Sequence, residues 1–184
     1  MSFCVALMVM IMANICNGEM RVLGSFESKK KLLDLFLREN STNKEKVIHF
    51  ARTWIKLGDE SLEEILKAKI LTIKFYCDWS VDFCLFNKSK EHENCPIIQN
   101  ISKELNLDIE IASEESGMGF TEFYHINKGC LEREECDNFP SEAYPIENYT
   151  DKNGAFHQDK YFKAIDSWYL RVYSKFSKEF INEA

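Results

Sequence analysis

The fold is decided by residues 61–77, which read SLEEILKAKILTIKFYC. Ser61 with Glu64 three positions later matches the capping box that begins many α-helices. The apolar residues that follow have helical spacing. Ile70 to Tyr76 is also rich in β-branched side chains and would suit a strand. Because the cap and the length of the run favour a helix, we predict one continuous helix here.

Helical spacing is also present on both sides of this segment. It occurs over residues 28–39, 44–57, 96–105 and 120–126. Residues 107–111 alternate between apolar and polar side chains and predict a short extended stretch. Residues 130–154, with two prolines and two cysteines, are expected to be irregular.

The strongest periodicity lies between Ala155 and Asn182. Its apolar positions are Phe162, Ile165, Tyr169, Val172, Phe176 and Phe180. One helix over this range would reach about 40 Å, longer than a compact domain of this size needs. We therefore expect its far end, Phe176 and Phe180, to pack on a second copy of the chain. The fold predicted is an all-α, single-domain bundle of about six helices that forms a homodimer.

The first eighteen residues, Met1 to Gly18, contain no charged side chain, and Phe3 to Met12 is almost purely apolar. An apolar run that ends at a small residue is typical of a secretory signal peptide. It is shorter than the roughly 20 residues of a membrane span. We predict a signal peptide over residues 1–18, a domain over residues 19–184, and a secreted, extracellular protein without membrane insertion. The alternative is a buried N-terminal helix.

Four positions match the acceptor pattern for N-glycosylation. They are Asn40, Asn87, Asn100 and Asn148. Four matches behind a predicted signal peptide favour a secreted glycoprotein, and each glycosylated asparagine must then lie on the surface.

Seven cysteines are present, and Cys4 and Cys16 fall within the predicted signal peptide, which leaves five. These are Cys77, Cys84, Cys95, Cys130 and Cys136. In an oxidising compartment they should form disulfides with one cysteine left over. On a continuous helix Cys77 and Cys84 would lie about 10.5 Å apart, beyond the roughly 7 Å that a disulfide spans. Each should therefore pair elsewhere, and Cys130 with Cys136 is one candidate; the connectivity stays open.

Catalytic patterns are not found in the sequence. His49, His92, His125 and His157 are scattered and suit surface or capping positions. Neither a paired-histidine metal motif, a nucleophile elbow nor a phosphate-binding glycine loop occurs. The net charge of −7 argues against general affinity for nucleic acid. We expect no enzyme activity, no cofactor, no metal and no nucleic-acid partner.

Short segments resemble the interferon-gamma branch of the class II helical cytokines. In helix order they are residues 31–36, 49–54, 63–76, 98–105 and 163–165. The sequons at Asn40 and Asn148 are similar in place to those of that family. The resemblance implies an intertwined dimer that binds a cell-surface receptor and performs no chemistry.

Two functions follow as expectations. The first is a secreted helical cytokine-like ligand for a cell-surface receptor. The alternative is a secreted, disulfide-containing helical effector or carrier that binds a hydrophobic ligand. A carrier should have an apolar cavity, whereas a cytokine should have a filled core and interlocked chains.

Overall fold

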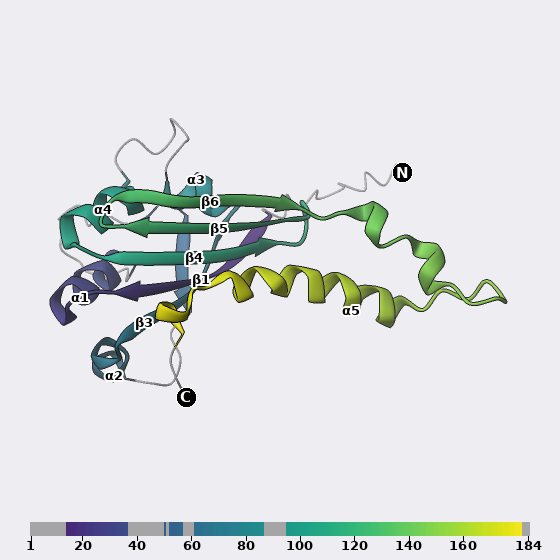
Figure 1. Cartoon of the computed structure of the whole chain (residues 1–184), viewed down its shortest axis with the longest axis horizontal. Coiled ribbons are helices and arrows are strands. Elements are labelled where there is room, and N and C mark those ends of the chain that lie inside the picture. Colours follow the sequence, from purple (N-terminus) through teal and green to yellow (C-terminus); the bar gives the residue numbers. More distant parts are fainter. Residues whose placement is uncertain (1–13, 37–49, 51, 57–60, 87–94, 182–184) are drawn as a thin grey trace, which may run out of the picture.

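A computed structural model describes residues 14–36, 50, 52–56, 61–86 and 95–181. Its centre is a six-stranded antiparallel sheet with the strand order β2-β3-β1-β4-β5-β6 (Figure 1). The strands are β1 (Ile15–Leu23), β2 (Thr53–Lys56), β3 (Ile70–Asp78), β4 (Asp108–Glu115), β5 (Phe120–Asn127) and β6 (Cys130–Asn138). This mixed α/β architecture contradicts the predicted all-α bundle and, with it, the interferon-gamma-like helical fold.

The helices are short and lie outside the sheet. The α-helices are α1 (Phe26–Asp34), α2 (Leu62–Lys67), α3 (Val81–Leu85), α4 (Ile98–Leu105) and α5 (Gln158–Tyr169). The 3₁₀ turns are η2 (Ser141–Ala143), η3 (Ile146–Tyr149), η4 (Leu170–Lys175) and η5 (Lys178–Phe180). Within the described residues, none of the helices has the length and apolar character that crossing a membrane requires.

The decisive segment divides into a helix and a strand. The capping box is confirmed, because the Ser61 hydroxyl accepts from the Glu64 amide and the Glu64 carboxylate accepts from the Ser61 amide. The helix nevertheless ends at Lys67, and β3 begins at Ile70. Along β3 the buried side chains alternate with more exposed ones, such as Lys74 and Tyr76. The period of two and the β-branched residues determine the strand, so the predicted continuous helix is wrong.

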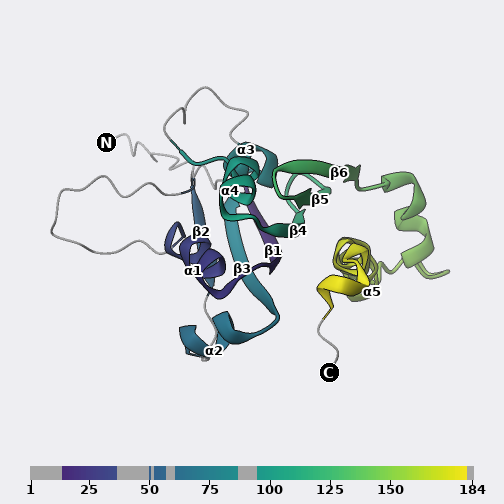
Figure 2. The same cartoon turned by 60° about the vertical axis from the view of Figure 1, so that its left-hand side comes forward.

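The two faces of the sheet are covered differently. The face we call the core face packs against α1, α3 and α4, and Met20, Ile111 and Tyr124 are buried there. Helix α5 lies on the other side of the sheet from these helices (Figure 2), and the η4 turn that follows it contacts β4 and β5. Since these C-terminal turns reach only part of that face, the side of β1 and β3 that faces away from the core remains more open.

The C-terminal segment is helical only as far as Tyr169 and then continues as η4 and η5. Val172 and Phe176 pack on Ala112 and Phe123 of the sheet. Phe180 lies edge-on to the His125 ring, with 5.9 Å between the ring centroids. Phe176 is 4 % exposed and Phe180 is 1 % exposed, so the chain itself covers both side chains. A second subunit is not needed to cover them, and the homodimer stays a prediction.

Strand β1 is central in the sheet and pairs with both β3 and β4. Cys16 is fully buried, and the Asn14 carbonyl accepts a hydrogen bond of 2.8 Å from the Trp79 amide. The predicted signal-peptide boundary at Gly18 therefore falls in the middle of this strand. Most of the predicted signal peptide, residues 1–13, lies outside the described residues.

Several other elements differ from the prediction. The segment 120–126 is strand β5 rather than a helix, and residues 130–138 form β6 rather than an irregular loop. Residues 53–56 form β2 within the range predicted as a second helix. Helices α1 and α4 and the extended stretch at residues 107–111 are confirmed in type, although their ends shift.

Candidate functional site

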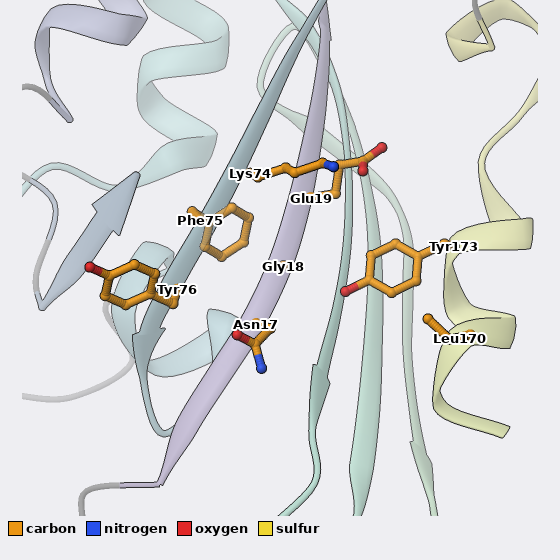
Figure 3. Close-up of a pocket in the computed structure, with 8 residues that line it drawn as sticks. All are labelled: Asn17, Gly18, Glu19, Lys74, Phe75, Tyr76, Leu170 and Tyr173. Atoms are coloured by element: carbon orange, nitrogen blue, oxygen red, sulfur yellow. The ribbon is translucent and has the colours of Figure 1, made fainter. Parts of the chain in front are cut away.

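A groove of about 480 Å³ lies between the opposite face of the sheet and η4 (Figure 3). This volume is in the range of small-molecule pockets. Strand β1 contributes Asn17, Gly18 and Glu19; β3 contributes Lys74, Phe75 and Tyr76; and η4 contributes Leu170 and Tyr173. The groove is therefore built from three segments that are distant from one another in sequence.

The strand register explains which side chains face the groove. Asn17 lies opposite Tyr76, and Glu19 lies opposite Lys74. Because successive side chains on a strand point to opposite faces, these four share the groove face. Gly18, which has no side chain, and Phe75, whose side chain is buried, lie between them. The floor of the groove between the polar side chains is consequently strand backbone.

Aromatic side chains form both walls of the groove. Tyr76 is 40 % exposed and stacks on Trp54 of β2, with 5.6 Å between centroids and 20° between planes. On the other side Tyr173 extends from η4 toward β1 (Figure 3). Leu170, one turn before it, is 62 % exposed. Two aromatic rings and one aliphatic side chain thus remain available to a ligand.

The end of the groove near Asn17 is acidic. The Asn17 amide donates a hydrogen bond of 3.3 Å to the Glu114 carboxylate on β4. Burial raises the pKa of the Glu114 carboxyl, and the nearby carboxylates of Glu115 and Asp166 raise it further. Burial also raises the pKa of Tyr173, with Glu114 among the neighbouring charges that contribute.

Two cationic side chains and one carboxylate lie at the other end of the groove. Glu19 accepts from Arg21 at 2.7 Å and lies across the strand pair from Lys74. Arg21 is itself held at the C-terminal segment, where its guanidinium lies 4.0 Å from the centroid of the Phe176 ring. It also donates a hydrogen bond of 3.0 Å to the Phe180 carbonyl. Lys74 is therefore the cationic side chain that lines the groove itself.

The glycosylation candidates are placed only in part. Asn100 lies in α4 and Asn148 in η3, and both are exposed. Asn40 and Asn87 lie outside the described residues. Exposure is required for a glycan but does not show one, so glycosylation stays a prediction.

The described cysteines are free thiols, and the candidate pairing of Cys130 with Cys136 does not fit their positions. Cys130 and Cys136 are both on β6, where six residues of extended chain separate them by about 20 Å, too far for a disulfide. Cys77 is on β3 and Cys84 on α3, so the predicted helix that kept them apart does not exist.

Cys77 instead belongs to a buried cluster with Cys16, its partner in register, and Cys84. Interactions with these two thiols, together with burial, raise the pKa of the Cys77 thiol. Cys95 is half-buried and lies neither in this cluster nor on β6.

The two described histidines, His125 and His157, do not come together in one site. His125 lies 2.8 Å from Asp108 and 3.5 Å from Glu132, where it contacts Phe180. His157 directly precedes α5, and the other two histidines are outside the described ranges. In the part of the chain that the structure describes, no group of three metal-ligating side chains comes together.

A buried carboxylate, Glu122 of β5, has a structural role on the core face. It accepts hydrogen bonds from the Val81 amide at the start of α3, from the Ser113 hydroxyl and from the Tyr124 hydroxyl. Burial raises its pKa. The carboxylate of Glu122 therefore holds the start of α3, a helix of only five residues. Because Glu122 lies on the core face, its side chain points away from the groove.

Sequence reasoning missed the groove residues because they share a face only when β1 and β3 are strands. One signal was available: from Cys16 to Val22, small or apolar residues alternate with Asn17, Glu19 and Arg21. Comparisons with protein-family models, curated proteins and solved structures found no match. The groove is therefore interpreted from its own geometry.

Proposed function

We propose that the protein is a non-catalytic binding protein whose groove holds a small ligand with an apolar body. The observation that supports this most is the exposed surface of Tyr76 and Leu170, together with the half-buried ring of Tyr173, around a volume of about 480 Å³. Serine, cysteine and histidine are not among the described residues that line it. Of the two functions expected from the sequence, the carrier is the one that this groove fits.

Both functions expected from the sequence, the cytokine-like ligand and the carrier, assumed a helical fold, which the six-stranded sheet contradicts. A hydrophobic ligand would gain roughly 25 cal/mol for each Å² of apolar surface that it buries in the groove. Strand backbone forms a rigid floor, and η4 is fixed to the sheet by Val172 and Phe176. The site therefore exists before a ligand binds, which reduces the entropic cost of binding.

The proposal is tested with Nile red, a neutral dye that fluoresces in apolar sites, and two matched variants. Leu170 lines the groove, whereas Ile146 of η3 is an aliphatic residue of similar exposure that does not line it. Leu170→Ser should weaken dye binding severalfold, since it removes apolar contact surface. Ile146→Ser should leave binding unchanged. Equal effects of the two substitutions, or no dye binding by the folded protein, would contradict the proposal.

A further inference from the structure

We propose that Cys16 and Cys77 form a disulfide between β1 and β3 when the chain folds under oxidising conditions, independently of what the groove binds. The two cysteines are direct partners in the antiparallel register of these strands. Both side chains are fully buried in the same hydrophobic core, so they lie on the same face of the sheet. The structure describes them as free thiols, which is the reduced form of the pair.

The backbone of the two strands already places this pair at a suitable distance. The Cα atoms of residues directly opposite each other on antiparallel strands lie about 4.5–5.5 Å apart. A disulfide requires about 4.4–6.8 Å between its Cα atoms. The pairing of β1 with β3 continues on the inner side of this pair as far as Leu23 opposite Ile70, so the strands are held in this register. The disulfide therefore needs no rearrangement of the sheet.

A third thiol, Cys84 on α3, is the competing partner for Cys77. Its side chain is also fully buried, and the Cys77 thiol interacts with both Cys16 and Cys84. The Cys84 thiol donates a hydrogen bond of 3.0 Å to the Asp78 carbonyl, which it would lose on pairing with Cys77. The Cys16 thiol has only a long contact of 3.9 Å with the Asn17 carbonyl. Pairing of Cys77 with its register partner is therefore favoured.

The bond forms by thiol–disulfide exchange with a small-molecule disulfide, for which oxidised glutathione is the probe. The thiolate of one cysteine attacks the glutathione disulfide, releases one glutathione and forms a mixed disulfide. The thiolate of the second cysteine then displaces the other glutathione. Two protein thiols and one oxidised glutathione thus give one protein disulfide and two reduced glutathione molecules, which take up the two protons.

This exchange takes place before the two strands close over the thiols. The thiolate is the reactive form of cysteine. In the folded protein, contact with the Cys16 and Cys84 thiols, together with burial, raises the pKa of the Cys77 thiol and disfavours its thiolate. The experiment therefore starts from the unfolded chain, in which these cysteines are accessible.

The test is refolding of the full chain from denaturant, either in a mixture of reduced and oxidised glutathione or in dithiothreitol. Digestion with trypsin and with a proteinase that cuts before aspartate places Cys77 and Cys84 in different peptides. Mass spectrometry should find the Cys77 peptide linked to the Cys16 peptide after refolding with glutathione, and unlinked after refolding in dithiothreitol. Fragmentation of the linked peptides distinguishes Cys16 from Cys4, which lies in the same peptide.

Thermal unfolding supplies a second measurement with matched variants. The bond closes a loop of about 60 residues in the unfolded chain, so the oxidised protein should have a Tm about 10 °C above that of the reduced protein. Cys16→Ala should abolish this difference. Cys84→Ala, which also removes a fully buried thiol, should retain it. Because each variant is compared with itself in two redox states, the cost of the smaller side chain cancels.

Two results would overturn the proposal. A link from Cys77 to Cys84, or to any cysteine other than Cys16, would show that the strand register does not select the partner. A Cys77 peptide that stays unlinked after refolding with glutathione would show that the pair remains reduced. Because the peptide mapping uses the unaltered chain, it decides between these results even if a cysteine variant does not fold.

Discussion

Gly18 and Phe75 lie directly opposite each other on β1 and β3, and a Cβ atom at residue 18 would lie only 2.3 Å from Cζ of Phe75. Phe75 is 3 % exposed, so its ring has little room to move. The small residue at this position is therefore explained by packing. The sequence alone had suggested a cleavage site there.

This contact predicts strong coupling between the two positions. Gly18→Ala should lower the free energy of unfolding by about 1–3 kcal/mol, the usual cost of overpacking a core. Adding Phe75→Leu should recover part of that loss, because the smaller side chain makes room for the methyl group. Urea unfolding of both single variants and the double variant measures the coupling. Strictly additive effects would show that the ring moves away without cost.

The N-terminal half of β1 gives a second prediction. A chain that begins at Glu19 lacks the strand pairs of residues 15–18 with β3 and the buried thiol of Cys16. We expect such a chain to be unfolded, or much less stable than one that begins at Asn14. Circular dichroism and thermal unfolding of the two chains, made in the same host, provide the comparison.

Secretion of the full sequence tests the predicted signal peptide. If the full sequence is expressed in a eukaryotic secretory host, cleavage after Gly18 would give a product with Glu19 at its N-terminus. A folded, stable product with that N-terminus would contradict the role of β1 described above. Mass spectrometry of the product determines the N-terminus and shows whether Asn100 and Asn148 are glycosylated.

A third prediction concerns Phe176, which contacts Phe123 with 5.9 Å between the ring centroids. Phe176→Asp would place a charge in this buried contact and should cost at least about 3 kcal/mol of stability. Ile181→Asp, at an exposed position close by, should cost little. Thermal unfolding measures both variants. If light scattering shows that the unaltered protein is a dimer and that the Phe176→Asp variant is a folded monomer, the predicted homodimer is supported.

The fourth prediction concerns pH. Because burial raises the pKa of Glu122 in the folded protein, the folded state binds this proton more tightly than the unfolded chain does. The stability that Glu122 contributes is therefore complete below its unfolded value of about 4.5 and is lost as pH rises through the folded pKa. Urea unfolding at a series of pH values should show this decrease.

Glu122→Gln is the matched variant for that measurement. The amide cannot ionise, so part of the decrease with pH should disappear. It also accepts fewer hydrogen bonds than the carboxylate, which has the Val81 amide, Ser113 and Tyr124 as donors. Below the folded pKa the Glu122 side chain is also neutral, so this loss should lower the stability of the variant only at higher pH, where Glu122 is ionised. An unchanged pH dependence would mean that Glu122 does not titrate in this range.

Two local signals in the sequence predicted local structure correctly. The Ser61 capping box and the apolar face of residues 98–105 each correspond to a helix in the structure. Sequence spacing was misleading where two periods overlap. Ile70, Ile73 and Cys77 fit a helical stripe, but Leu71, Ile73, Phe75 and Cys77 alternate along a strand and are the side chains that the core buries.

The groove could not be predicted from local patterns, because its two sides meet only through tertiary structure. Asn17 and Tyr76 become neighbours through the pairing of β1 with β3. Tyr173 reaches them because the C-terminal helix ends at Tyr169 and the chain continues as η4 along the sheet. Periodicity over residues 155–182 indicated a longer helix, since a 3₁₀ turn keeps nearly the same apolar spacing.

The central place of β1 has a consequence for synthesis on the ribosome. This strand is made before its neighbours β3 and β4, which end at Asp78 and Glu115. The Phe180 carbonyl that accepts from Arg21 follows it by 159 residues. Contacts between parts of a chain that are distant in sequence form slowly. The nascent chain should therefore depend on chaperones until β3 and β4 have been made and can pair with β1.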